Sequence, residues 1–352
     1  MTYHLVESVE NNQTSFVELP IDGNLFLDHK SSFGLDFWHS SIGRKWVGSF
    51  LNSKPFSFKV TNGADSASLH CLLRRLPGNY YLASAYPYAS IQGNAALIWG
   101  NIPILQKALR ERRIIKLEMP FAGEYADQSI KDHTKIAEYR NSSLDAVRHV
   151  IDISHAKGDL KWLDNHFGRK IRWAVNKSKR SGCTVREATA EEVDIIQKLY
   201  VKTMRAKGAP VNYSAERFEG IITSLSPKGL GKVYVGCVDN KPAGFAAVVD
   251  GTISRHFIQL AVPPEAQSYR LSELLVSTVI QDAVVIGKSY FDFMASQKDD
   301  KGLISFKAKW GAKEEDINYV TIVAYPLLSQ IVSLMRWGNK LRGKFNASKA
   351  HS

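Results

Sequence analysis

The sequence predicts an α/β protein of the α+β type, with two successive domains that each hold a mixed, mostly antiparallel sheet flanked by helices. The length supports this, because 352 residues suit two domains when single domains cluster near about 100–200 residues. The order of elements agrees, since both halves read as a meander of strands, then a helix, then a strand. We therefore expect a domain over residues 1–155, a second over 156–325 and a basic amphipathic tail over 326–352.

In the first half, turn signals separate short apolar segments and so predict an antiparallel meander. Asn62-Gly63 and Pro77-Gly78-Asn79 are two of these turns. The predicted strands are Arg44–Leu51, Pro55–Thr61, Ser66–Leu73, Tyr80–Ala85 and Ile114–Met119. A helix is expected over Ile102–Arg113, where the apolar residues have helical spacing.

The second half opens with a predicted strand, His149–Ser154, and one long helix from Asp159 to Gly182. The apolar stripe of this helix consists of Leu160, Leu163, Phe167, Ile171 and Val175. Its other faces are basic and include Arg172 and Lys177. Such faces indicate either contact with a polyanion, such as a nucleotide pyrophosphate or an RNA backbone, or an ordinary solvated surface.

The remaining elements lead up to a strand near residue 290. A capping box, Thr189 to Glu192, opens a helix, and Asp250-Gly251 is a hairpin turn. The predicted strands are Val233–Val238, Ala243–Val249 and Ile253–Leu260, followed by a helix over Leu271–Ile286.

The stretch from Ser289 to Gly311 combines a strand, a polar loop and a helix. The predicted strand is Tyr290–Met294, the loop is Ser296–Asp300, and Gly311 ends the helix. Leu303, Ile304 and Phe306 are expected to face inward. Polar groups at the carboxyl end of a strand often bind ligands in α/β sheets, although an arrangement made only for packing is the alternative.

Composition narrows the class of protein. The chain is 44% hydrophobic and 23% charged, which is ordinary for a soluble globular protein. No apolar run approaches the ~18–20 residues that span a bilayer, and residues 1–12 lack the apolar core of a signal peptide. Cys71, Cys183 and Cys237 are widely separated and suit reduced thiols in a cytosol. The cysteines therefore favour a cytoplasmic protein. The histidines are not at metal-ligand spacing and there is no Cys-x-x-Cys motif, so we expect no metal site.

The formal net charge of +12 also needs a cause. A basic protein attracts nucleic acid, phosphorylated small molecules or an anionic membrane face. A generally basic surface that serves solubility is the alternative.

Several short motifs resemble the FemABX-type acyltransferases, a group related to the GNAT N-acyltransferases. The matching residues are Phe291-Asp292-Phe293, Gly302-Leu303, Phe306-Lys307, Trp310-Gly311, Ile171-Arg172, Ala174, Gly182 and Val185-Arg186-Glu187. The resemblance is strongest over 150–325 and fainter over 40–120, where Tyr86-Pro87-Tyr88 stands at a Tyr/Pro/Gly-rich loop of the family. It implies tandem GNAT-like domains.

The resemblance also implies a reaction. In GNAT-like folds an acyl thioester or aminoacyl ester lies between two splayed strands, where an amine attacks its carbonyl through a tetrahedral oxyanion. Lys307, by its likeness to the lysine of the family's Phe-Lys pair, is the catalytic candidate, with an exposed surface lysine as the alternative. The candidate substrate-binding residues are Tyr88, Arg172, Lys177, Tyr269, Arg270, Asp292 and Phe306.

Two departures from relatives bear on the substrates. The loop Pro264–Glu273 lacks the glycines with which acetyl-CoA enzymes hold pyrophosphate, which disfavours CoA relative to aminoacyl-tRNA. Leu260-Ala261-Val262 replaces a Gly-Ala-Ser triplet, so the acceptor pocket is expected to differ.

We therefore expect an N-acyltransferase that acts on an amine of a cell-envelope precursor or sugar nucleotide. The donor is an aminoacyl-tRNA, an acyl-CoA or an acyl carrier thioester, and no tightly bound cofactor is predicted. The expected partners are a phosphorylated small-molecule acceptor, tRNA and, through the basic tail, the inner membrane face. A non-catalytic polyanion-binding module of the same fold is the alternative function, and a tail packed on the protein body is the alternative for 326–352.

Overall fold

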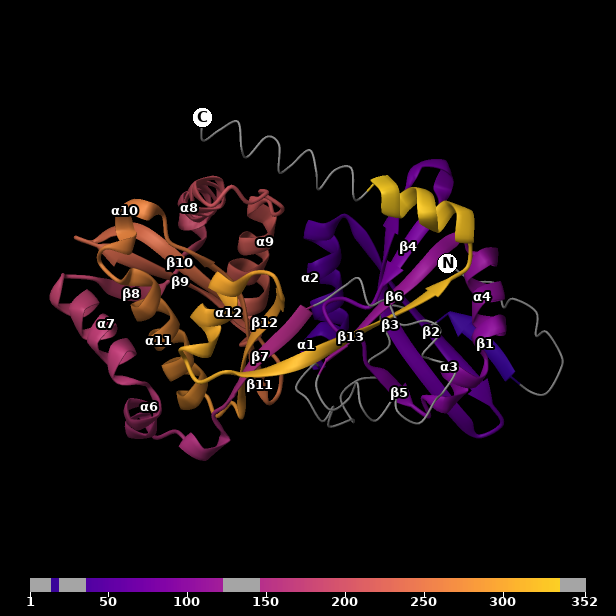
Figure 1. The fold of residues 1–352 in the computed structure, drawn as a ribbon, viewed down its shortest axis with the longest axis horizontal. Helices are drawn as coiled ribbons and strands as arrows, with labels where there is room; N and C mark the ends of the chain where they lie inside the picture. The colour runs from indigo at the N-terminus through magenta and orange to yellow at the C-terminus, as the bar shows by residue number, and fades with distance from the viewer. Residues whose placement is uncertain (1–13, 19–35, 123–145, 336–352) are drawn as a thin grey trace. The chain divides into compact units, whose positions relative to one another are not determined.

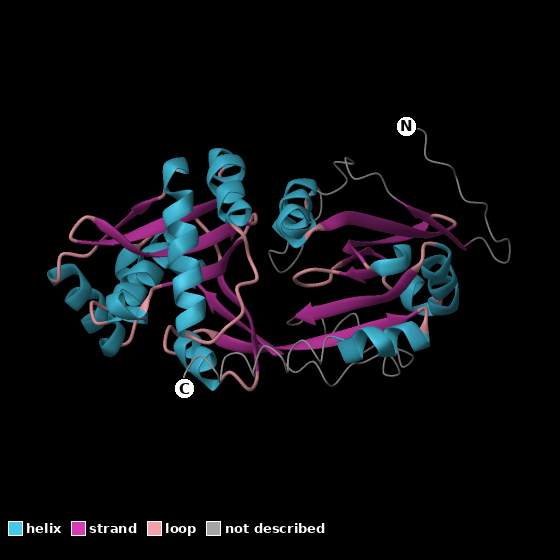
Figure 2. Ribbon diagram, turned by 90° about the horizontal axis from the view of Figure 1, so that it is seen from above, coloured by secondary structure: helices cyan, strands magenta, loops and turns pink. Residues whose placement is uncertain are grey.

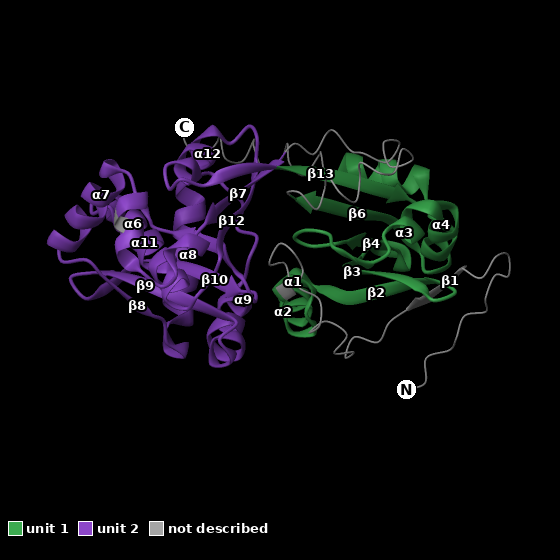
Figure 3. Cartoon of the chain, turned by 90° about the horizontal axis from the view of Figure 1, so that it is seen from below, with its two compact units in different colours: residues 1–145, 316–339 green, residues 146–315, 340–352 purple. Residues whose placement is uncertain are grey.

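The computed structural model describes residues 14–18, 36–122 and 146–335 (Figure 1). The chain forms two compact units, and the helices of each unit flank its strands (Figure 2). Unit 1 comprises residues 1–145 and 316–339, and unit 2 comprises 146–315 and 340–352 (Figure 3). No helix in the described part of the chain is long and apolar enough to cross a membrane.

The unit boundaries differ from the expected 1–155 and 156–325. Strand β7 (Ala146–Asp152) belongs to unit 2, because it pairs antiparallel with β12 (Tyr290–Gln297). Strand β13 (Lys313–Val323) returns to unit 1 from residue 316, because it pairs antiparallel with β6 (Ile114–Ala122). Pairing between distant strands therefore decides the division.

Unit 1 contains a mixed sheet in the order β1-β2-β3-β4-β6-β13, with β5 paired to β3. Only β4 and β6 are parallel among the pairs of this sheet that the described residues form. Its other elements are β1 (Thr14–Glu18), α1 (Asp36–His39), α2 (Ser41–Leu51), β2 (Ser53–Asn62), β3 (Asp65–Arg75), β4 (Tyr81–Ser84), β5 (Ile91–Gly93), α3 (Ala96–Gly100) and α4 (Ile102–Glu111). Residues 326–335 form a further helix after β13.

The predicted strand Arg44–Leu51 is wrong, because these residues form helix α2. The Ser40 side chain accepts a hydrogen bond from the Gly43 N–H (3.0 Å) and so caps the helix start. At the other end Asn52 adopts a left-handed conformation (φ 48°) and bonds back to the Gly48 carbonyl. The two caps fix a helix where the apolar spacing alone was ambiguous.

Unit 2 contains a second mixed sheet, which runs β7-β12-β11-β10-β9-β8. Strands β11 and β12 are parallel, and the other pairs are antiparallel, which confirms the predicted fold class. Its other elements are α6 (Leu160–His166), α7 (Arg169–Arg180), β8 (Thr184–Glu187), α8 (Val193–Ala206), α9 (Ala215–Gly220), β9 (Gly231–Val238), β10 (Lys241–Asp250), β11 (Ser254–Ala261), α10 (Pro264–Gln267), α11 (Leu271–Val285) and α12 (Lys301–Ala308).

The single long helix expected from Asp159 is two helices, α6 and α7. The chain is extended at Phe167 (ψ 126°) and Gly168 (ψ 154°), and this breaks the helical hydrogen bonding. Most of the predicted stripe is buried, but Leu160 is exposed. Strand β12 is also longer than expected and includes Ser296 and Gln297 from the predicted loop.

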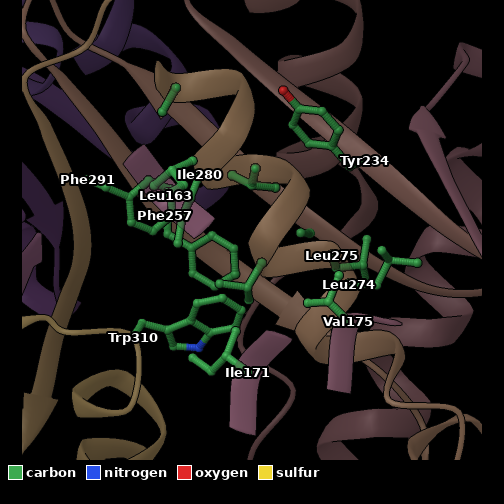
Figure 4. Packing of buried hydrophobic residues seen from close by; sticks show 14 of the residues in the cluster. Leu163, Ile171, Val175, Tyr234, Phe257, Leu274, Leu275, Ile280, Phe291 and Trp310 are labelled. Carbon is green, nitrogen blue, oxygen red and sulfur yellow. The ribbon is translucent and has the colours of Figure 1, made fainter. Parts of the chain in front are cut away.

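The core of unit 2 lies between the sheet and helices α7 and α11 (Figure 4). Phe257 of β11 and Phe291 of β12 have ring centroids 5.8 Å apart, so aromatic contacts join the two parallel strands. Trp310 follows α12 and packs edge-on against Phe167 at 5.2 Å. Gly311 ends this segment with φ +81°, and a Cβ atom there would lie only 2.7 Å from Nε2 of His166.

A buried ion network crosses the same sheet. Arg255 of β11 is fully buried and donates two hydrogen bonds to the Asp250 carboxylate, at 2.8 and 2.9 Å. It donates a third to Asp282 of α11 at 2.6 Å. A charge this deeply buried is stable only while its partners remain.

We expect Arg255→Met to destabilise the protein by about 3–5 kcal/mol, because it leaves the buried Asp250 carboxylate without its counter-ion. Urea unfolding followed by tryptophan fluorescence measures the change. Lys202→Met is the control, since Lys202 forms an exposed pair with Glu265 and such pairs contribute about 0–1 kcal/mol. Equal effects from both substitutions would contradict the prediction.

Candidate active site

Strands β11 and β12 separate after a short parallel ladder. They pair only over Ser254–His256 and Tyr290–Asp292. Beyond that point β11 continues along β10, whereas β12 pairs with β7 through Ala295, Ser296 and Gln297. The sheet therefore opens directly after His256 and Asp292.

Met294 marks the place where β12 leaves its neighbour. It has a left-handed conformation (φ 62°), which is unfavourable for a side chain of this kind, and the β12–β7 register shifts between Asp292 and Ala295. The Met294 N–H donates to Oδ1 of Asp292 at 2.7 Å. The Met294 carbonyl accepts from Nζ of Lys307 at 2.8 Å. Two charged side chains thus hold both polar groups of the strained peptide segment.

Asp292 is fully buried at the centre of this arrangement. Its Oδ2 accepts a hydrogen bond from Nε of Arg148 (3.0 Å) and lies 3.0 Å from Nδ1 of His256. Burial alone would raise the pKa of Asp292, but the Arg148 charge and the His256 bond outweigh it and lower that pKa to about 2. The carboxylate is therefore ionised at neutral pH.

Arg148 and His149 of β7 extend the charged cluster to the start of β13. Arg148 also donates to Glu315 at 3.3 Å. His149 is fully buried, with Nε2 3.7 Å from a Glu314 carboxylate oxygen. Burial, followed by the nearby charge of Lys307, lowers the pKa of His149. Its imidazole is therefore neutral at pH 7.

Lys307 is the buried residue of α12, with 4% of its surface exposed. The alternative interpretation from the sequence, that Lys307 is an exposed surface lysine, is therefore wrong. The expected inward face is also corrected, because Leu303 is 39% exposed while Ile304 and Phe306 are half-buried. Besides Met294, the ammonium donates to the Ala295 carbonyl at 3.3 Å. Burial lowers the pKa of Lys307 to about 8, against the opposing pull of Asp292 and Asp300.

A second feature is a cavity of about 490 Å³ that borders α7, α11 and α12. Its lining residues are Gly168, Arg169, Lys170, Ile171, Trp173, Ala174, Arg270, Glu273 and Lys309. Trp173 is 52% exposed, and the charged ends of Lys177 and Arg270 lie 5.6 and 5.8 Å from its ring centroid. Lys309 pairs with Glu273 at 2.9 Å. An open aromatic ring among cations suits a planar group that carries phosphates.

The predicted site residues fall into separate places. Asp292 and Lys307 meet at Met294, and Lys177 and Arg270 meet at Trp173. The remaining four do not join either group: Arg172 is exposed and does not line the cavity, Tyr269 and Phe306 pack against the core of unit 2, and Tyr88 is buried in unit 1.

Sequence reasoning missed Arg148, His256 and Trp173. Histidine in an otherwise apolar strand and tryptophan on a basic helix were the available signals. Among the described residues, no three His, Cys, Asp or Glu side chains are placed to hold a metal ion.

Comparisons with known proteins bear on the fold of the chain. Residues 165–302 match the family model of the acetyltransferase (GNAT) domain. FemX is similar over 80% of this chain and 90% of its own, at 12% identity and a TM-score of 0.62. A tandem GNAT protein from the clavulanic acid biosynthesis pathway is similar over 89% of this chain and 99% of its own, at 12% identity and a TM-score of 0.57. The C-terminal domain of a putative lysylphosphatidylglycerol synthetase from Agrobacterium fabrum is similar over 76% of this chain and 85% of its own, at 13% identity and a TM-score of 0.50. No curated protein matches the sequence.

Unit 2 therefore carries a GNAT-type acyltransferase domain, and the chain has a tandem GNAT fold. The chain shares its fold with FemX, which agrees with the resemblance of the motifs between Phe291 and Gly311 to FemABX-type proteins.

The lowered pKa of Lys307 predicts a pH dependence of stability. The folded protein releases this proton near pH 8 and the unfolded chain near 10.5, so the charged lysine opposes folding at lower pH. The free energy of unfolding of the wild type, relative to Lys307→Met, should rise by about 2 kcal/mol between pH about 7 and about 9.5. Urea unfolding of both proteins at both pH values tests this, and a constant difference would refute it.

Proposed function

We propose that this chain is an N-acyltransferase whose reaction takes place where β11 and β12 separate. The observation that carries the proposal is the buried lysine at this opening. A lysine ammonium has three N–H donors, and the described residues accept two of them, at Met294 and Ala295. The third is available to a developing oxyanion. The bonds to Met294 and Ala295 hold the ammonium in place before the reaction begins.

The chemistry follows from this placement. The acceptor amine attacks the donor carbonyl and forms the C–N bond, and the carbonyl oxygen becomes an oxyanion beside Lys307. The oxyanion then collapses, the C–O or C–S bond of the donor breaks, and the proton lost by the amine ends on the departing oxygen or sulfur, which leaves as an alcohol or thiol. Lys307 stabilises the charge in a site shielded from water, where a fixed cation acts more strongly than at a surface.

The cavity at Trp173 supplies a place for the donor's nucleotide. Its cations suit phosphates, and an exposed indole suits a stacked base. Both an aminoacyl-tRNA and an acyl-CoA carry these groups. The loop Pro264–Glu273 before α11 contains no glycine, so it lacks the residues with which acetyl-CoA enzymes hold pyrophosphate, and this favours aminoacyl-tRNA. The name of the similar lysylphosphatidylglycerol synthetase also supports aminoacyl transfer.

For the acceptor, we propose an amine on a phosphorylated cell-envelope precursor or sugar nucleotide. The resemblance of the motifs between Phe291 and Gly311 to the FemABX-type acyltransferases supports this choice. The non-catalytic polyanion-binding module remains the second candidate, favoured by the cationic cavity. Incubation with charged tRNA or acyl-CoA and candidate amines, followed by mass spectrometry for an amide product, distinguishes the two. Binding without any amide product would favour the second candidate.

Lys307→Met should reduce turnover by roughly 10²–10³-fold, because it removes a charge aimed at the oxyanion. Some loss of stability is expected too, since the Met294 and Ala295 carbonyls lose a buried donor. Kinetics are therefore measured on folded protein below its unfolding transition. Lys301→Met, on the exposed end of the same helix, is the control. Equal turnover in the two variants would remove Lys307 from the mechanism.

Trp173→Ala should raise the Michaelis constant for the donor by about tenfold and leave kcat nearly unchanged, since stacking on a base contributes about 1–3 kcal/mol. Arg180→Gln on the same helix removes an exposed charge outside the cavity and should have little effect. An unaltered Michaelis constant for Trp173→Ala would show that the cavity does not hold the donor.

A further inference from the structure

The helix over residues 326–335 exposes an apolar side to solvent. It is the yellow helix that follows β13 in Figure 1. Leu327, Leu334 and Met335 are 76%, 67% and 65% exposed, and Ile331 is 47% exposed. These positions follow the spacing i, i+4, i+7 and i+8, which lies along one side of an α-helix. They form a continuous stripe, called here the apolar stripe.

The residues that precede this helix fix it to unit 1. The Tyr325 hydroxyl donates to the Arg110 carbonyl at 2.8 Å, and Gln106 donates to the Val323 carbonyl at 2.9 Å. Leu328 and Val332 on another side of the helix are half-buried. The helix is therefore held on unit 1 by one side, while the apolar stripe on its other side stays exposed.

The charged residues of the C-terminal part of the sequence are all positive. Residues 326–352 contain Arg336, Lys340, Arg342, Lys344 and Lys349, and they contain no Asp or Glu. The whole chain has a formal net charge of +12. Such a segment attracts an anionic surface and repels a second copy of itself.

We infer that the apolar stripe docks the protein onto an anionic lipid bilayer. An amphipathic helix that carries apolar side chains and adjacent basic residues lies in the plane of the bilayer interface, with the apolar side inserted and the cations at the headgroups. One helix side with four apolar residues is also far smaller than the ~1,200–2,000 Å² buried in stable protein–protein interfaces. This surface does not depend on the proposed enzyme activity.

Cosedimentation of the full chain with lipid vesicles tests the inference. We expect binding to phosphatidylcholine vesicles that contain phosphatidylglycerol, and little binding to pure phosphatidylcholine. Added salt should weaken it, because the charge attraction is screened over ~10 Å at 0.1 M. The triple substitution Leu327→Ser, Leu334→Ser and Met335→Ser should lower the partition coefficient by about tenfold or more. Circular dichroism should be unchanged, because these side chains are exposed.

A matched control removes apolar side chains elsewhere on the surface. Val285, Ile286 and Leu303 in unit 2 are 60%, 43% and 39% exposed, and their replacement by Ser should leave vesicle binding intact. Equal binding by wild type and the Leu327, Leu334 and Met335 variant would overturn the inference, as would absence of wild-type binding. A change from dimer to monomer in that variant, with vesicle binding unaltered, would assign the apolar stripe to a second copy of the chain.

Discussion

The double attachment of Met294 is the interaction on which the candidate site depends. Asp292 accepts its N–H and Lys307 donates to its carbonyl, so a left-handed residue is held by two opposite charges. Each charge is buried, and each would be costly without its hydrogen bonds. Arg148 and His256 complete the surroundings of Asp292. The opening of the sheet and the position of the ammonium are therefore set by one connected group of side chains.

Local signals in the sequence predicted much of the fold. The Asp250-Gly251 turn and the Thr189 capping box act over a few residues, and both are confirmed. The helix that was expected to end at Gly311 already ends at Ala308, and Gly311 follows it with φ +81°. Strand β13 was not predicted, because its partner β6 lies about 200 residues earlier and no local sequence motif indicates the pairing. The mistake at Arg44–Leu51 has a local cause, since Ser40 and Asn52 cap a helix there.

The candidate site was predicted only where a motif carried it. Lys307 and Asp292 belong to short family motifs, and they do lie together. Arg148, His256 and Asp292 come from three different strands, so their meeting depends on strand register, which a single sequence does not specify. Trp173 was passed over, because a tryptophan on a helix more often packs inward than faces solvent.

The return of β13 to unit 1 has a consequence for synthesis of the chain. Residues 316–323 complete the first sheet, and they follow the whole of residues 146–315. During translation, every strand of the unit 2 sheet is synthesised before unit 1 has received its last strand, which contributes Val320 and Ile322 to the unit 1 core. The usual order, in which the N-terminal domain finishes first, is thus reversed. The β6 edge stays unpaired on its β13 side while the ribosome makes the intervening residues.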